Sequence, residues 1–167
     1  MHEKIIEDKA HNLRTKQYEV ESCAKLNAED SPNGPKVLVV NDEERKRYYI
    51  HKALEKFESI RYIDAENGKD AKRICENNNI FMMVMDMSFP WEAGGNEEGI
   101  SGIRLVKELE KMYESIGKEM PVLIVYSTMM FESAMKTAGE PLSKTFYGQT
   151  FYQGGLEELL NDFFNQK

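Results

Sequence analysis

Short apolar runs alternate with segments of helical periodicity along residues 36–167. A run of about four to eight apolar residues between polar ones is typical of a strand that is buried on both faces of a sheet. Such runs predict strands at 37–40, 81–85 and 122–126, with a weaker strand at 59–64 and a short candidate at 145–147. We therefore expect five strands.

Between these runs, apolar residues recur at the spacing that places them on one face of a helix. They predict helices at about 43–57, 69–77, 103–113, 129–138 and 156–164. Strands that alternate with helices predict an α/β fold, here a doubly wound, five-stranded parallel sheet with helices on both faces. The expected strand order is the flavodoxin-like 2-1-3-4-5.

Residues 1–35 differ from the rest of the chain. Ile6, Leu13 and Val20 recur every seven residues and predict a helix with a thin heptad stripe, and the run EDSPNGPK after it has the composition of a linker. The predicted division is a helical extension and linker at 1–35 and a globular domain at 36–167. The helix either docks on its own domain or pairs with a partner, which includes a second copy in a homodimer.

Composition narrows the function classes. With 41% hydrophobic residues, 31% charged residues and no apolar run near 18 residues, the chain reads as a globular protein without a membrane span. The absence of an apolar signal segment and the unpatterned Cys23 and Cys75 favour a cytoplasmic location. A net charge of −7 argues against binding of nucleic acid by this chain alone, and the basic run ERKRYY at 44–49 fits the solvent face of a helix.

Polar residues follow the predicted strands, and in a sheet of this kind the working site lies beyond the carboxyl ends of the strands. The first strand precedes Asn41 and Asp42, and the third precedes Asp86. Since the first and third strands are neighbours in such a sheet, Asp42 and Asp86 should face each other. Asp42 or Asn41 has an alternative role, as the N-cap of the next helix.

Two such carboxylates have a definite chemistry. Held about 4 Å apart, they repel each other by roughly 4 kcal/mol at an effective dielectric constant near 20. A bound Mg²⁺ would relieve that repulsion, because Mg²⁺ prefers oxygen ligands and often shares a phosphate. A carboxylate beside it can attack phosphorus to give an aspartyl phosphate. A hydroxyl after the fourth strand and a lysine ammonium could hold the other phosphoryl oxygens.

Four segments resemble the receiver domains of response regulators in two-component signalling. The family's first strand with its acidic pair resembles KVLVVNDEE, and its phosphoacceptor strand, with a proline four residues after the aspartate, resembles VMDMSFP. Its next helix and fourth strand resemble GISGIRLVKEL and PVLIVYS. The resemblance runs from about Lys36 to the C-terminus.

The resemblance implies a role for several residues. Asp86 is the phosphoacceptor, Asp42 and Asp86 are Mg²⁺ ligands, and Ser88 offers its backbone carbonyl to the metal, with Glu43 as a further candidate. A histidine kinase or phosphotransfer protein would supply the phosphoryl group. An output protein would read the result at a face around the fourth helix and fifth strand. Enzymatic activity would be limited to the phosphorylation and dephosphorylation of Asp86 itself.

The sequence departs from the family pattern at four points. Asn41 replaces the first acid of the pair. The loop after Pro90 carries a longer insertion, WEAGGNEEG, which is expected to be a solvated segment; in the alternative, its acids Glu92, Glu97 and Glu98 alter the access of a metal or partner. The hydroxyl switch position falls on Ser127 or Tyr126. The family's lysine falls on Lys144, or else Gln149 replaces it, in an alignment that puts Phe146 at the family's aromatic position.

These departures leave two functions open. The first is a phosphorylated receiver domain whose output is a partner protein or the N-terminal helix, since the chain ends with the last predicted helix. The alternative is a degenerate pseudo-receiver that binds proteins without phosphorylation. A hydrolase of the haloacid-dehalogenase type is disfavoured, because that family needs a second acid where Ser88 stands.

Overall fold

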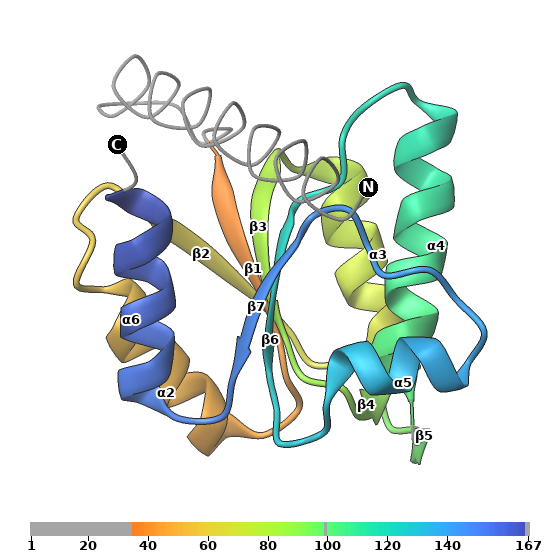
Figure 1. The fold of residues 1–167 in the computed structure, drawn as a ribbon, viewed down its shortest axis with the longest axis horizontal. Coiled ribbons are helices and arrows are strands. Elements are labelled where there is room, and N and C mark those ends of the chain that lie inside the picture. The colour runs from red at the N-terminus through yellow and green to blue at the C-terminus, as the bar shows by residue number, and fades with distance from the viewer. Residues whose placement is uncertain (1–34, 99, 166–167) are drawn as a thin grey trace, which may run out of the picture.

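A five-stranded parallel sheet forms the centre of the molecule (Figure 1). The computed structural model describes residues 35–98 and 100–165. The strands of the sheet are β1 Lys36–Val40, β2 Arg61–Ala65, β3 Ile80–Met85, β6 Val122–Tyr126 and β7 Phe146–Thr150. Their order is β2-β1-β3-β6-β7, which is 2-1-3-4-5 when the five are counted along the chain. The predicted fold class and strand order are confirmed.

Helices cover both faces of this sheet (Figure 1). On one face lie α2 Glu44–Leu54 and α6 Gln153–Phe164; on the other lie α3 Gly68–Asn77, α4 Ser101–Ser115 and α5 Phe131–Thr137. Successive residues of a strand point to opposite faces. Val84 therefore packs in the core beneath α2 and α6, and Met83 and Met85 pack in the core beneath α3, α4 and α5. This double burial explains why the central strands are continuously apolar.

The main differences from the prediction are the end of one helix, the length of one strand and an additional hairpin. Helix α2 ends at Leu54 rather than near 57, and turn hydrogen bonds of 3.0 and 3.1 Å then lead through Phe57 and Ile60 into β2. Strand β7 is longer than the predicted 145–147 because it continues through Gly148 to Thr150. Within the insertion, β4 Phe89–Pro90 pairs with β5 Glu97–Glu98 as a small antiparallel hairpin.

The first residue of the insertion is anchored, whereas residues 92–96 are exposed, as predicted for a solvated segment. The Trp91 side chain is 5% exposed and packs in the core beneath α3 and α4. The Arg104 guanidinium lies 3.9 Å from the centre of its ring, and the Trp91 carbonyl accepts a hydrogen bond of 2.9 Å from the N–H of Lys69. Burial of the single tryptophan holds the hairpin against the domain.

The predicted N-terminal helix and the linker up to residue 34 lie outside the described residues. The predicted domain boundary therefore stays a prediction. Within residues 35–98 and 100–165, no helix is both long enough and apolar enough to cross a membrane.

Candidate functional site

Strand pairing brings the ends of β1 and β3 together. Val40 is the register partner of Met85, so Asn41 and Asp86 follow at neighbouring positions on the same edge of the sheet. The Asp86 N–H donates to the Val40 carbonyl at 2.9 Å, which continues the strand ladder up to the carboxylate. The backbone therefore fixes the place of Asp86 beside the loop that carries Asp42.

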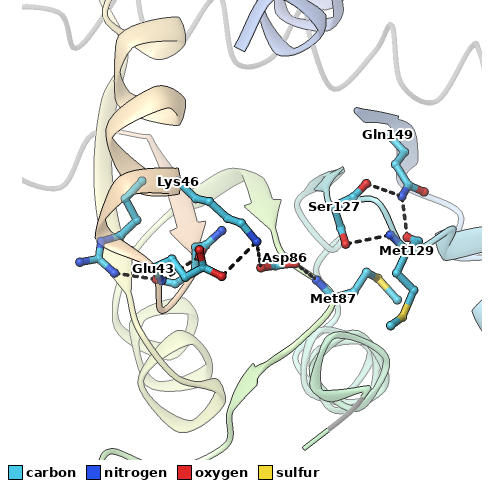
Figure 2. Close-up of polar contacts among 9 residues, drawn as sticks. Glu43, Lys46, Asp86, Met87, Ser127, Met129 and Gln149 are labelled. Atoms are coloured by element: carbon cyan, nitrogen blue, oxygen red, sulfur yellow. Dashed lines mark hydrogen bonds and ion pairs between the residues drawn. The ribbon is translucent and has the colours of Figure 1, made fainter. Parts of the chain in front are cut away.

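The Asp86 carboxylate is almost fully buried, at 5% exposure. Its Oδ1 accepts a hydrogen bond of 2.7 Å from the Met87 N–H, and its Oδ2 lies 3.5 Å from the Lys46 ammonium (Figure 2). Burial raises the pKa of Asp86 above its ordinary value, although the Met87 N–H, the Lys46 charge and the Ser127 hydroxyl each oppose that rise. Asp86 is thus a buried acid with a partner for each oxygen.

Lys46 is the site residue that sequence reasoning missed. It lies in the first turn of α2 and contacts Glu43 Oε1 at 3.2 Å as well as Asp86 (Figure 2). Burial tends to lower the pKa of Lys46, but the Asp86 and Glu43 carboxylates together raise it above its ordinary value. The run ERKRYY had predicted only a solvent-facing surface, because the direction of a lysine on a helix depends on how the helix is rotated against the sheet.

Asn41 acts in local structure. It is completely buried, its Oδ1 accepts a hydrogen bond of 2.9 Å from the Glu43 N–H, and its carbonyl accepts one of 2.8 Å from Arg47. This Asx-type turn leads the chain from β1 into α2. Neither Asn41 nor Asp42 caps the helix, because the N-cap residue is Glu43 and no side chain makes a cap hydrogen bond there.

The predicted magnesium ligands include one buried oxygen that no described residue engages. Asp42 Oδ1 is buried and has no hydrogen-bond partner among the described residues. A buried oxygen of this kind usually binds a cation or a water molecule. Asp42, Asp86 and the Ser88 carbonyl are the predicted ligands. In the described part of the chain, no cluster of three or more His, Cys, Asp or Glu side chains is placed to hold a metal. Two carboxylates and a carbonyl suit Mg²⁺, which usually keeps several waters.

Ser127 and Tyr126, the two candidates for the hydroxyl position, point to different environments. Tyr126 ends β6 and is buried in the core beneath α2 and α6. The Ser127 hydroxyl lies near enough to Asp86 to lower the pKa of that acid. It also accepts a hydrogen bond of 3.1 Å from the Met129 N–H (Figure 2). Of the two, Ser127 is the hydroxyl that the structure brings to the acid.

Gln149, and not Lys144, stands at the carboxyl end of the fifth strand of the sheet. Lys144 precedes β7, whose first residue is Phe146, so it lies at the opposite end of a parallel strand. Its assignment to the site is wrong, because the alignment behind it needed a strand before Lys144. Gln149 donates from Nε2 to the carbonyls of Ser127 and Met129 at 2.9 and 2.6 Å (Figure 2). Its Oε1 accepts a hydrogen bond of 2.9 Å from the Phe131 N–H.

The alignment that replaces the lysine by Gln149 also assigns Phe146 to the family's aromatic position. The Phe146 ring is 6% exposed and lies 4.9 Å from the Phe131 ring, measured between centroids. It therefore packs under α5 in the described structure.

Comparisons with known proteins show which proteins have a similar sequence and fold. No family model matches the chain. The response regulator UvrY of Escherichia coli (strain K12) is 32% identical over 76 residues, which make up 45% of this chain and 31% of UvrY, and UvrY of Shigella flexneri matches to the same extent. The matched region spans about a third of the length of these curated relatives.

Solved structures extend the likeness over most of the domain. A response regulator receiver protein from Pseudomonas putida has a TM-score of 0.55 at 21% identity and covers 77% of this chain and 96% of its own. The signal receiver domain of an HD domain-containing protein from Pseudomonas fluorescens Pf-5 has a TM-score of 0.58 at 13% identity, over 83% and 92% of the two chains.

RcsB from Salmonella enterica serovar Typhimurium, solved bound to the promoter rprA in the presence of the phosphomimetic BeF₃⁻, has a TM-score of 0.56 at 19% identity, over 77% of this chain and 60% of RcsB. The strand order, the acids after β1 and β3 and these superpositions agree: the chain has the fold of the receiver domains of response regulators.

Proposed function

We propose that this chain is a receiver domain of a two-component or phosphorelay system and that it accepts a phosphoryl group on Asp86. The observation that carries the proposal is the position of Asp86. It is a buried carboxylate at the carboxyl edge of the sheet, with the Ser127 hydroxyl and the Lys46 ammonium beside it. A histidine kinase or phosphotransfer protein is the proposed donor, and the cytoplasm is the proposed location.

The proposed reaction is a displacement at phosphorus. One Asp86 oxygen forms a bond to phosphorus while the bond between phosphorus and the donor's leaving group breaks, and the leaving group keeps the electron pair. Asp42, Asp86 and the Ser88 carbonyl would hold Mg²⁺, which would neutralise charge on the transferring group. The Ser127 hydroxyl would donate to a phosphoryl oxygen.

The loop between β6 and α5 supports a route from Asp86 to a partner-binding face. The Ser127 hydroxyl accepts a hydrogen bond from the Met129 N–H, and the Gln149 amide donates to the carbonyls of Ser127 and Met129. The side chains of Met129 and Met130 are exposed beyond this loop. If the Ser127 hydroxyl turns to a phosphoryl group, Met129 loses one of its anchors, so the exposed methionines would shift. An output protein is the proposed reader, with a homodimer as one form of it.

A pseudo-receiver is the second candidate, and Gln149 favours it. An amide that is already committed to the loop backbone supplies no cation for a phosphoryl group. With Asn41 in place of an acid, phosphorylation would then be lost while the binding surface remained.

The two functions differ in one measurement. The full chain is treated with Mg²⁺ and acetyl phosphate, and its intact mass is measured for the native protein, Asp86→Asn and Asp162→Asn. Asp162 lies on α6 and serves as a surface control. A receiver adds one phosphoryl group to the native and Asp162→Asn chains and none to Asp86→Asn.

Hydrogen exchange with and without beryllofluoride follows the response of the loop. The receiver predicts a change in exchange at residues 127–138 on addition of beryllofluoride. A folded protein that adds no phosphoryl group and shows no change contradicts the receiver and leaves the pseudo-receiver.

A further inference from the structure

Lys46 occupies the position from which a cation neutralises Asp86. Its Nζ lies 3.5 Å from Asp86 Oδ2, while Asp86 Oδ1 is engaged by the Met87 N–H at 2.7 Å. Both carboxylate oxygens thus have partners already. Among the ion pairs of the described residues, Lys46 is the cation that contacts Asp86.

The residue at the end of the fifth strand cannot share this task. Gln149 is neutral, and its amide groups bind the backbone of the loop between β6 and α5. A buried carboxylate that lacks a cation is strongly destabilising. The side chain of Asp86 is 8% exposed and that of Lys46 is 40% exposed, so the lysine reaches in from the surface to cover the acid.

A divalent ion at Asp86 would meet this ammonium. Mg²⁺ binds carboxylate oxygens at about 2.0–2.1 Å. An ammonium that stays on the same oxygen would then lie within a few ångströms of a double positive charge, with little water between them to screen the repulsion. The metal and the Lys46 ammonium therefore compete for this oxygen of Asp86.

The structure also supplies a place for the displaced lysine. Glu43 Oε1 lies 3.2 Å from Lys46 Nζ, and the Glu43 side chain is 53% exposed. The ammonium can leave Asp86 and remain paired with Glu43 at the surface. Asp42 Oδ1, which is buried and has no partner among the described residues, would then act as a ligand beside Asp86.

We propose that Lys46 is a resident counter-ion of Asp86 and that a divalent cation binds at Asp86 only by displacing it toward Glu43. The inference rests on the magnesium site of the proposed function, but it does not require that phosphoryl transfer takes place. It makes Lys46 a positioning residue that sets the metal affinity of the site.

Direct metal binding tests this inference. Free Mn²⁺ is measured by electron paramagnetic resonance while the full chain is titrated with MnCl₂, and MgCl₂ competition gives the Mg²⁺ affinity. Lys46→Met should bind both ions about tenfold more tightly than the native chain, because the competing charge is gone. Lys46→Arg keeps the charge and should bind no more tightly than the native chain.

Two controls separate this effect from net charge and from binding elsewhere. Lys52→Met removes the same charge from the exposed part of α2, where Lys52 pairs loosely with Glu55 at 3.9 Å, and should leave the affinity within about twofold of native. Adding Asp86→Asn to Lys46→Met should abolish the tight binding. A second readout is thermal unfolding without metal, in which Lys46→Met should melt lower than native and gain more from MgCl₂.

The outcomes are distinct from those of the phosphorylation test. Equal or weaker metal binding by a folded Lys46→Met overturns the counter-ion inference, even if acetyl phosphate still labels Asp86. Tighter binding by Lys46→Met without any labelling of Asp86 supports the inference and contradicts the proposed receiver function. Absence of metal binding in every variant overturns the inference together with the magnesium site.

Discussion

At the scale of single residues, Lys46 and Gln149 each make contacts that shape the site. The positive charge that contacts the Asp86 carboxylate belongs to Lys46, on helix α2. The end of the fifth strand carries Gln149 instead, whose amide stabilises a loop. An amide suits the second role because it donates and accepts at the same time. Gln149 uses both abilities, since it binds two carbonyls and one N–H.

Replacing Gln149 should destabilise the domain. Gln149→Leu leaves the Phe131 N–H and two carbonyls of the loop without their partner, so the free energy of unfolding should fall by about 2 kcal/mol in urea titrations. Gln149→Lys should also be destabilising, because an ammonium cannot accept the Phe131 N–H. The control is Lys144→Met, an exposed change expected within about 0.5 kcal/mol of native. A Gln149→Leu chain as stable as native would show that the loop does not depend on this amide.

Cys75 should react slowly in the folded protein. Burial, together with the nearby Glu76, raises the pKa of its thiol from the ordinary value of 9.0 to about 11, although the Tyr113 hydroxyl opposes the rise. A raised pKa means less thiolate at a given pH, so at pH 8 only about one thiol in a thousand is ionised.

The measurement uses a disulfide reagent on a Cys23→Ser chain. Modification of Cys75 should be at least about a hundredfold slower in buffer than in urea, and it should speed up as the pH rises toward 11. Equal rates in buffer and in urea would contradict the burial of this thiol.

At the scale of elements, burial decided what the sequence could predict. Strands β1, β3 and β6 are apolar at nearly every position because both of their faces are covered, so their positions were read correctly. Strand β7 is only partly buried and includes Gly148, and its sequence FYGQT carries a weaker signal, which is why its length was missed.

Some residues of the candidate site could be predicted from the sequence and others could not. Asp42 and Asp86 could be predicted as candidates because they follow apolar strands, and the strand order determines which strand ends are neighbours. Lys46 was missed because its contact with Asp86 depends on how α2 is rotated and how far its side chain reaches. A run such as ERKRYY is the same in sequence whether one of its lysines faces solvent or a buried acid.

The hairpin of the insertion depends on close packing between Trp91 and α3. A Cβ atom on Gly68 would lie 2.1 Å from the Trp91 ring, so Gly68→Ala should force the ring out and lower the free energy of unfolding by about 1–3 kcal/mol. Trp91 fluorescence should shift to longer wavelength as the ring meets water. In a Trp91→Leu background the same glycine change should cost less, because the ring is absent. An equal cost in both backgrounds would assign the effect to the helix backbone and not to Trp91.

At the scale of the whole molecule, the five strands separate two cores. The core beneath α2 and α6 and the core beneath α3, α4 and α5 are both built from residues within 37–163. Since each central strand contributes to both, loss of packing on one face loosens the sheet that supports the other. This coupling is typical of a domain that unfolds in one cooperative step.

A chain of residues 35–167 should therefore fold without the first 34. Every helix that covers the sheet and every strand within it begins after Pro35 in the described structure. We expect this shorter chain to unfold cooperatively, with a Tm within about 4 °C of the full chain, which corresponds to a difference near 1 kcal/mol for a domain of this size. Calorimetry of the two chains side by side gives the comparison. A Tm lower by about 10 °C or more, or a broad transition, would mean that residues 1–34 contribute to the stability of the domain, and the predicted boundary at 35 would then be wrong.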